Sequence, residues 1–526
     1  VTANGQPVPD TEVRVTGPLG RTAVSGQDGA YSMPRLSPGV YQVTVSRFGY
    51  QDFTGTATVT DGQTATVGIT LTQKPGGVVS GTVTVAGAPV ADATVTAAGT
   101  GARTVTDATG HYQIRLPYGS YQLQVGASRC DTSADEQITV AGDMTRNVGL
   151  QRRADDFGYT CAVGTEPYVA GTQRLTLPPD STTERVALPF PVPFYGALRN
   201  EIWVAPFGLA TFTEVSIVNS ENDSLPYPDV PDLAIYPFWD ILTLPDDSGV
   251  YTATVGTAPH RSFVIEWRDI AIVGSDEHIS FSALLGEDGT ISYRYKDLGT
   301  DRSKGRGATI GIENADGTDA LLYSYNTSSL TDGQSLTFAA EGHGVVRGTV
   351  TDANDGQPVA GATVTFPHVA TFTTGQDGTF SGQIRAGNHT AQVSGENYGT
   401  TTRQVTVVAR DITTMDTELI TGKVVAAPTQ VSLTAPPGGT GTATVTLTNQ
   451  GWPTPYDVTV ESAQSGWLNV SPLTGGLLKN QSATLTVTAS ATGLTPGDTR
   501  AGELLIHSTS ARRPTVRVPV TLTVPE

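Results

Sequence analysis

Three copies of one short sequence unit recur along the chain, and this internal repetition constrains the fold more than any other feature. Two copies open alike, as Gly-Thr-Val-Thr-Val-Ala from Gly81 and Gly-Thr-Val-Thr-Asp-Ala from Gly348. Each of these continues into Pro-Val-Ala-x-Ala-Thr-Val, from Pro89 and Pro358, and the first copy has its own Pro-Val at Pro7. A unit of about 75 residues buries only a small core by itself. The chain is therefore expected to form several small domains that gain from stacking against their neighbours.

A tight turn followed by an aromatic residue comes later in each copy. An Asp-Gly or Thr-Gly pair stands just before Tyr31, Tyr112 and Phe380, with one residue between. Gly supplies the positive φ that a two-residue hairpin turn needs. The segment Tyr-Gln-Leu-Gln-Val from Tyr121 alternates between the two faces of a strand, so that one face is buried. Each copy is therefore predicted to be a small β-sandwich.

Composition extends this prediction to the whole chain. Its 526 residues include 59 Gly and 33 Pro, which is typical of many short strands joined by tight turns. We predict an all-β tandem array of transthyretin-like or immunoglobulin-like β-sandwiches with one larger central β-sandwich. The formal net charge of −19 opposes binding to nucleic acid, which needs clustered cationic charge. No apolar run approaches the roughly 20 residues that cross a bilayer, so no membrane span is expected.

The repeated residues resemble the carboxypeptidase regulatory-like family, whose fold is a transthyretin-like seven-stranded sandwich. The resemblance covers three stretches of the chain: residues 1–73, 77–150 and 344–420. It implies noncatalytic spacers or folding adjuncts of the kind found in secreted bacterial proteases and surface proteins. Alignment of Pro7 with Pro89 puts Val1 on Val83, so the first copy lacks the opening Gly-Thr. We therefore expect that copy to be N-terminally truncated and the native chain to extend upstream.

Residues 155–340 form a different segment, rich in aromatic residues. Its stretches Pro-Phe-Tyr-Gly up to Gly196, Ile-Tyr-Pro-Phe-Trp-Asp up to Asp240 and Gly-Ile-Glu-Asn-Ala-Asp-Gly-Thr-Asp from Gly311 resemble the nidogen-like extracellular β-sandwich. That family implies an adhesion or scaffold domain, with no established catalytic residues to transfer.

Residues 426–526 make up the last segment. Its stretch Trp-Leu-Asn-Val-Ser-Pro-Leu-Thr-Gly from Trp467 resembles an immunoglobulin-type module of the BACON-like kind. Some relatives of that module are suspected of binding glycans or mucin. The domain order is thus repeat, repeat, large sandwich, repeat, immunoglobulin-like module.

Motifs for catalysis are missing from the sequence. The seven histidines show no metal-ligand spacing, and neither H-E-x-x-H, G-x-S-x-G nor a phosphate-binding loop occurs. A glycosidase would need two carboxylates about 5–10 Å apart, for which Glu266, Asp269 and Asp240 are the candidates. Alternation places Glu266 on the same strand face as Val264 and Arg268, which favours a solvated outer-face residue. We predict that this chain is not an enzyme.

The sequence offers two candidate binding sites, one for calcium and one for sugar rings, and each also has a simpler structural explanation. Asp240, Asp246 and Asp247 offer hard oxygen ligands for calcium, although a solvated acidic turn explains them as well. No other cofactor is expected. Trp203 and Trp467 are candidates for stacking on sugar rings, although burial in sandwich cores accounts for both.

The chain has two cysteines, Cys130 and Cys161, and no third cysteine competes for pairing. A single disulfide between them would imply an oxidising compartment and would join the second repeat to the start of the central segment. Two unrelated buried thiols are the alternative.

These observations favour a secreted, extracellular, noncatalytic accessory or scaffold region. The resemblances imply the C-terminal part of a secreted bacterial serine protease of the subtilisin-like kind, with the catalytic domain upstream. Its partners would be that catalytic domain and an extracellular protein or polysaccharide substrate, and we expect a monomer. The alternative is a cell-surface adhesin or carbohydrate-binding protein. An enzyme in the central segment is a third hypothesis, which predicts hydrolysis that is abolished by Glu266→Gln.

Overall fold

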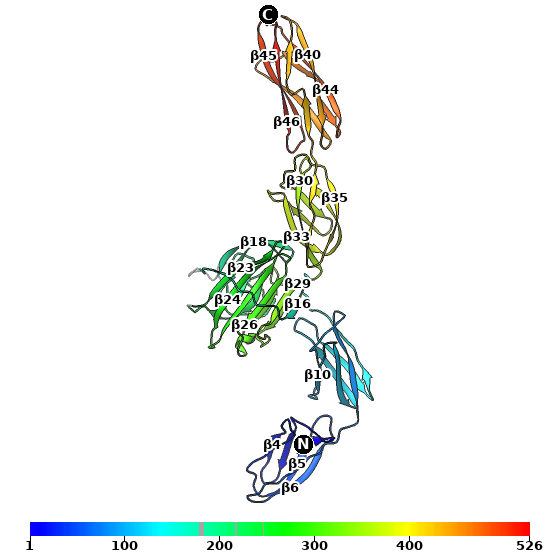
Figure 1. The fold of residues 1–526 in the computed structure, drawn as a ribbon, viewed down its shortest axis with the longest axis vertical. Helices are drawn as coiled ribbons and strands as arrows, with labels where there is room; N and C mark the ends of the chain where they lie inside the picture. Colours follow the sequence, from blue (N-terminus) through cyan, green and yellow to red (C-terminus); the bar gives the residue numbers. More distant parts are fainter. Residues whose placement is uncertain (178–182, 216–217, 246) are drawn as a thin grey trace. The chain divides into compact units, whose positions relative to one another are not determined.

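The computed structural model describes residues 1–177, 183–215, 218–245 and 247–526, and these are built almost wholly from strands and turns (Figure 1). The prediction of an all-β fold made of tandem β-sandwiches is confirmed. The chain divides into two compact units, one of Val1–Ala154 with Thr160–Val163 and one of Asp155–Tyr159 with Gly164–Glu526. Among the described residues, no helix has both the length and the apolar character needed to cross a membrane.

The first repeat has one four-stranded sheet. Its strands lie in the order β4 (Arg21–Val24), β3 (Glu12–Thr16), β5 (Gly39–Val45) and β6 (Phe53–Val59), and β1 (Thr2–Ala3) pairs separately with β2 (Gln6–Pro7). Alternation on β3 and β5 buries Val13, Val15, Tyr41 and Val43 on one face of this sheet. The pattern read from the sequence therefore points the apolar residues toward a common core.

The second repeat has two sheets that enclose its core. One has the order β10 (Arg103–Val105), β9 (Thr94–Ala97), β12 (Gly119–Gly126) and β13 (Ala134–Val140). The other has the order β11 (His111–Pro117), β7 (Gly76–Val85) and β14 (Met144–Thr145), with β8 (Ala88–Pro89) and β15 (Val148–Leu150) also on β7. The opening strand β7 thus pairs in parallel with the closing strands β14 and β15. β7 needs a glycine at position 81, because a Cβ at Gly81 would overlap the Arg146 carbonyl oxygen.

A central sandwich follows in the second unit. One sheet has the order β29 (Ser335–Ala340), β26 (Ile291–Lys296), β25 (His278–Gly286), β24 (His260–Ile272), β23 (Gly249–Thr257) and β17 (Gln173–Arg174), with β22 (Leu242–Thr243) on β24. The other has the order β18 (Glu184–Phe194), β19 (Ala197–Ala205), β20 (Leu209–Thr211), β21 (Ala234–Trp239), β27 (Thr309–Glu313) and β28 (Ala320–Tyr325). Large aromatic side chains fill its core, where Trp267 stacks on Phe281 with ring centroids 5.2 Å apart. A short π-helical turn, η1 (Arg302–Arg306), interrupts the strands.

The third repeat has the same topology as the second. One sheet has the order β33 (Thr379–Arg385), β30 (His343–Asp352) and β36 (Ile412–Thr414), with β37 (Thr417–Leu419) also on β30. The other has the order β32 (Ala370–Thr373), β31 (Thr363–Phe366), β34 (Gly387–Ser394) and β35 (Thr401–Val407). Gly348 of β30 faces Phe380 across the sheet, as Gly81 faces Tyr112 in the second repeat. The shared sequence pattern therefore produces the same strand register twice.

The last domain is a sandwich of two sheets. One has the order β38 (Val424–Ala427), β40 (Thr440–Asn449), β44 (Ser482–Ser490) and β42 (Leu468–Ser471). The other has the order β39 (Val431–Thr434), β46 (Thr515–Thr523), β45 (Thr499–Ser508), β41 (Thr454–Ser462) and β43 (Thr474–Leu477). β39, near the start of the domain, runs parallel to the closing strand β46.

Candidate functional site: the junctions of the third repeat

The junction between the central sandwich and the third repeat is held by one carboxylate and two arginines. Glu287 lies in the turn after β25 and its side chain is 5% exposed. It accepts hydrogen bonds from Arg261 Nε and Nη2, both at 2.9 Å. Arg347 on β30 of the third repeat donates from Nη1 to Glu287 Oε1 at 3.1 Å. The bonds from Arg261 lower the pKa of Glu287, so this carboxylate stays charged between the two guanidinium groups.

A second group of contacts crosses the same junction. The Phe157 ring stacks on the His343 ring with centroids 4.7 Å apart and an interplanar angle of 17°. Burial lowers the pKa of His343, which favours the neutral imidazole in this stack. Gln383 on β33 is buried, and its Oε1 accepts a hydrogen bond from Gly196 N at 3.3 Å. The two domains are therefore joined by an ion-pair network and by a packed aromatic contact.

The junction between the third repeat and the last domain is centred on Asp352. This residue ends β30 and is fully buried. Arg512 of the last domain places Nε 3.1 Å from Asp352 Oδ2. Asp352 also accepts hydrogen bonds from Asn354 N to Oδ1 at 2.8 Å and from the Tyr398 hydroxyl to Oδ2 at 3.2 Å. Burial, followed by the negative charge of Asp352, raises the pKa of Tyr398 to about 12. The phenol therefore stays protonated and donates its hydrogen bond to Asp352.

The guanidinium of Arg512 also binds backbone of the third repeat. Its Nη2 donates to the carbonyl oxygens of Gln357 at 3.0 Å and Pro358 at 2.6 Å. One side chain thus meets a buried carboxylate and two carbonyls of the neighbouring domain. The planar guanidinium suits this task, because it presents several donors in a fixed geometry.

Close packing of an aromatic ring on a glycine completes this junction. Trp452 lies over Gly399, where an added Cβ would come within 2.6 Å of the ring. The turn that carries Trp452 is fixed by Asn449, which is fully buried. Asn449 donates to the Trp452 carbonyl at 2.8 Å and accepts from Lys423 N at 3.0 Å. Gly399 therefore has a packing role that any larger side chain would disturb.

The structure describes two of the three predicted calcium ligands, and these two differ in burial. Asp240 is buried, and its Oδ2 lies 3.1 Å from Arg302 Nη2, so a cation already occupies this carboxylate. Asp246 lies outside the described residues, and Asp247 is exposed. Among the described residues, no three His, Cys, Asp or Glu side chains are grouped to hold a metal ion. The calcium site stays a prediction, and in the structure Asp240 has the guanidinium of Arg302 as its partner.

The predicted sugar-stacking residues lie in cores. Trp203 on β19 is 8% exposed, and Trp467 next to β42 is 3% exposed. An added Cβ at Gly502 would lie 3.1 Å from the Trp467 ring, which shows how tightly this ring is covered. A sugar ring stacks on an open aromatic face, so this burial favours the core role that the sequence also allowed for both residues.

The expectation that Glu266 is solvated is also wrong. Its side chain is 3% exposed, because the segment before β17 covers this face of the sheet. Tyr168 OH donates to Glu266 Oε1 at 3.0 Å and Gly171 N donates to Oε2 at 2.7 Å. Arg268 Nε donates to Oε1 at 3.2 Å while its guanidinium lies 3.8 Å from the Tyr251 ring centroid. Glu266 is therefore a structural anchor and not a free carboxylate.

Glu313 is a buried acid that sequence reasoning did not single out as a site. It ends β27, is fully buried and accepts hydrogen bonds from Tyr227 N and from Tyr236 OH, the latter at 2.7 Å. Burial raises its pKa to about 7. The signal in the sequence is an acid at the end of the strand Thr-Ile-Gly-Ile-Glu, whose four preceding residues all suit a core.

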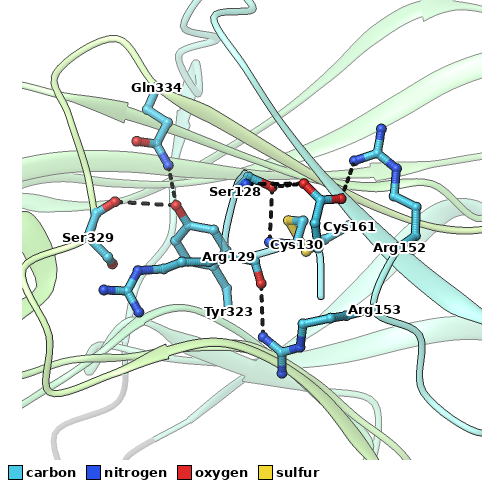
Figure 2. The surroundings of a disulfide bond; sticks show 10 residues. Ser128, Arg129, Cys130, Arg152, Arg153, Cys161, Tyr323, Ser329 and Gln334 are labelled. Atoms are coloured by element: carbon cyan, nitrogen blue, oxygen red, sulfur yellow. Dashed lines mark hydrogen bonds and ion pairs between the residues drawn. A yellow bond between two sulfur atoms is a disulfide. The ribbon is translucent and has the colours of Figure 1, made fainter. Parts of the chain in front are cut away.

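The two cysteines form the predicted disulfide, with Cα atoms 5.2 Å apart (Figure 2). Cys161 lies on β16 (Tyr159–Gly164), and Cys130 lies in the turn between β12 and β13. Asp131 fixes this turn, since it accepts from Ser128 Oγ at 2.6 Å and from Arg152 Nη1 at 3.2 Å. The disulfide therefore joins a rigid turn of the second repeat to the strand that follows the repeat.

Family models match most of the chain. Residues 1–72, 78–151 and 345–420 match the carboxypeptidase regulatory-like domain. Residues 158–368 match the NIDO related family, and residues 423–523 match the viral BACON domain. These are accessory domain types, and none of them is catalytic. No curated protein matches the chain.

Three solved structures illustrate the similarity of parts of the chain to known folds. A PapD-like domain of human CEP192 is 16% identical, with 20% of this chain and 86% of that domain covered and a TM-score of 0.17. The E. coli chaperone DraB is 15% identical, with 20% of this chain and 56% of the chaperone covered and a TM-score of 0.17. A protein of unknown function from Porphyromonas gingivalis is 15% identical, with 34% and 91% covered and a TM-score of 0.18.

Proposed function

We propose that the chain is a noncatalytic scaffold that holds its domains in series, and that the junctions of the third repeat make its last three domains one rigid spacer. The observation that carries this proposal is the use of β30 at both of its junctions. Arg347 on this strand binds Glu287 of the central sandwich at 3.1 Å, and Asp352 at its end binds Arg512 of the last domain at 3.1 Å. A rigid spacer needs such ion pairs between its domains, because independent domains on short linkers reorient freely.

The bonding of the buried acids in the central sandwich supports a role without catalysis. The two most buried acids of the central sandwich, Glu266 and Glu313, are each bound by a tyrosine hydroxyl and a backbone N–H. A general acid or base must reach a substrate proton at hydrogen-bond distance. The alternative of a carbohydrate-binding adhesin lacks support of this kind, because Trp203 and Trp467 are buried.

We further propose that this scaffold is the accessory region of a secreted bacterial serine protease of the subtilisin-like kind. Accessory domain types and a disulfide, which persists in oxidising compartments, support this assignment. In this role the scaffold is secreted, acts as a monomer, and brings a catalytic domain of the same chain to an extracellular protein or polysaccharide substrate. Deleting the region from the secreted enzyme is expected to reduce turnover of an insoluble substrate and to spare a short soluble peptide. Equal loss on both substrates would count against the targeting role.

The rigid-spacer proposal is tested by the distance between two labels on the full chain. Spin labels attached through encoded keto amino acids at the exposed positions Asp276 and Lys479 leave the native cysteines untouched. Pulsed electron paramagnetic resonance is expected to give one narrow distance distribution. Replacement of Arg347 and Arg512 by alanine is expected to broaden it, whereas Arg513→Ala is the matched control. A broad distribution in the parent chain would refute the rigid spacer.

A further inference from the structure

One buried charge of the central sandwich has no charged partner among the described residues. Arg294 lies on β26 and is 9% exposed. In the described part of the chain, its guanidinium makes one hydrogen bond, from Nη1 to the Tyr293 carbonyl oxygen at 3.3 Å, and its Nε has no acceptor. Burial lowers the pKa of Arg294, and the charge of Glu166 opposes this shift only in part. Because a buried arginine still carries its charge, it needs an anion or several acceptors beside it.

The other buried charged side chains of this domain are all bonded within the residues that the structure describes. Their partners are tyrosine hydroxyls and arginine side chains, and the residues concerned are Asp155, Asp240, Glu266, Glu287 and Glu313. Buried polar groups in folded proteins are paired with few exceptions. Arg294 is the exception in this domain, which points to a partner supplied from outside the chain.

The neighbouring strand β24 shows what β26 leaves open. On β24, Glu266 stands two positions before Arg268 on the same face, and Arg268 Nε donates to Glu266 Oε1 at 3.2 Å. On β26, Ser292 stands two positions before Arg294. The Ser292 hydroxyl lies 2.8 Å from Thr337 Oγ1 and brings no negative charge. The place of the carboxylate is therefore vacant on β26.

A hollow of about 290 Å³ lies beside this place. The residues that line it include His260, Ser262, Leu284, Asp288, Ser292 and Arg294. Small-molecule sites occupy about 300–1,000 Å³, so this hollow lies at the small end of that range. It suits a ligand of the size of one sugar unit.

The charges around the hollow balance except for that of Arg294. Glu287 and Asp288 are matched by the two arginines that hold Glu287, Arg261 and Arg347. Arg294 therefore leaves one net positive charge. A carboxylate carries one negative charge and fits the fork of a guanidinium. A phosphate with two charges would be repelled by Glu287 and Asp288, so a monoanion is favoured.

We propose that this hollow binds the carboxylate of a uronate unit in an acidic polysaccharide, with the Arg294 guanidinium as its ion partner. Ser262 and Asp288 offer hydrogen-bonding groups for the sugar hydroxyls, and Leu284 offers an apolar surface to the ring. Recognition by charge needs no aromatic platform, so it does not depend on the buried tryptophans. The inference names the substrate class for the targeting role proposed above, and for its purpose it rests on that role.

Isothermal titration calorimetry of the full chain tests the ligand. The probes are short oligomers of galacturonate, glucuronate and mannuronate, each compared with its methyl ester, which keeps the hydroxyls and removes the charge. We expect at least one oligomer to bind at least about tenfold more tightly than its ester, as for other hydrogen bonds to charged groups. The proposal is overturned if none of the three binds, if the esters bind equally, or if acetate or inorganic phosphate binds as tightly.

The role of the guanidinium is tested by Arg294→Met. This variant is expected to weaken binding of the oligomer at least about tenfold. Its melting midpoint should not fall, because an apolar side chain of similar length replaces an unpaired buried charge. Arg306→Met is the matched control, since Arg306 is exposed in the same domain and does not line the hollow. Unchanged binding in the Arg294 variant would overturn the proposal.

A second variant supplies the missing carboxylate from the chain itself. Ser292→Glu reproduces the spacing of Glu266 and Arg268, so it is expected to pair with Arg294, raise the melting midpoint and weaken uronate binding at least about tenfold. Ser292→Gln, of the same size without the charge, should weaken binding less. Equal weakening by both would contradict a site based on charge. These variants leave both junctions of the third repeat intact, so the label distances test the rigid spacer separately.

Discussion

Arg512 offers the sharpest test of the junction between the third repeat and the last domain. Its partner Asp352 is fully buried, so removal of the guanidinium leaves a carboxylate without its cation. Loss of one partner from a buried ion pair costs about 3–5 kcal/mol. The Arg512 side chain is 33% exposed, and solvent screening lowers its contribution. Asp352 also keeps its bonds from Asn354 N and Tyr398 OH. We expect Arg512→Ala to weaken docking of the last domain by about 2 kcal/mol.

Trp452 reports this docking directly. The other four tryptophans are buried, at 8% exposure or less, whereas Trp452 is 45% exposed and rests on Gly399. Acrylamide quenching of the full chain should therefore reach Trp452 first. We expect Arg512→Ala to raise the quenching constant of this accessible component, because the ring loses its cover when the domains separate.

A double-mutant cycle gives the magnitude of the pair. Urea unfolding of Arg512→Ala, Asp352→Asn and the double variant is expected to give a coupling free energy of about 1–2 kcal/mol. Arg513→Ala is the control, because its guanidinium makes no ion pair among the described residues. The reasoning is refuted if the two substitutions are additive and Trp452 quenching does not change.

Three further predictions concern other parts of the chain. Glu313 has a pKa raised by burial to about 7, so its ionisation destabilises the folded state and stability is lost as pH rises from about 4.5 through about 7; Glu313→Gln should flatten this dependence in thermal melts. Reduction of the Cys130–Cys161 disulfide, which spans 31 positions, is expected to cost about 3–4 kcal/mol by chain entropy and to speed exchange in the turn at Cys130; equal exchange before and after reduction contradicts this. Glu287 has a lowered pKa, so its ionised form stabilises the folded state above the pKa of the unfolded state, and this stabilisation is lost as pH falls through the pKa of the folded state. Acid should therefore loosen the junction between the central sandwich and the third repeat. Arg347→Ala should weaken this effect of acid, measured by the label distance at pH 3 and 7.

Much of the fold could be predicted because its signals are local. The turn before Tyr112 and the glycines of the opening strand lie within a few residues of the structure they determine. The alternation along β7 likewise fixes which residues are buried, with Val79 and Val83 both at 0% exposure. The repeated pattern then transfers the same register to the third repeat, where Gly348 faces Phe380.

The site residues were harder to predict because their partners are distant in sequence. Glu266 looks solvated from its own strand, and its burial comes from Gly171, which is 95 positions away. Arg512 and Asp352 are 160 positions apart, and no local pattern marks either as a junction residue. Whether such a side chain is buried depends on the loops and neighbouring domains that cover it in the folded chain. Strand periodicity carries no information about these distant contacts.

The parallel pairing of opening and closing strands has a mechanical consequence. β7 pairs with β15 in the second repeat, β30 with β37 in the third, and β39 with β46 in the last domain. When the two ends of such a domain are pulled apart, the force acts along these strands in opposite directions. The hydrogen bonds between them are then loaded in shear and must break together, whereas a hairpin pulled from its open end breaks one bond at a time. The second repeat, the third repeat and the last domain are therefore built to resist tension applied through their ends.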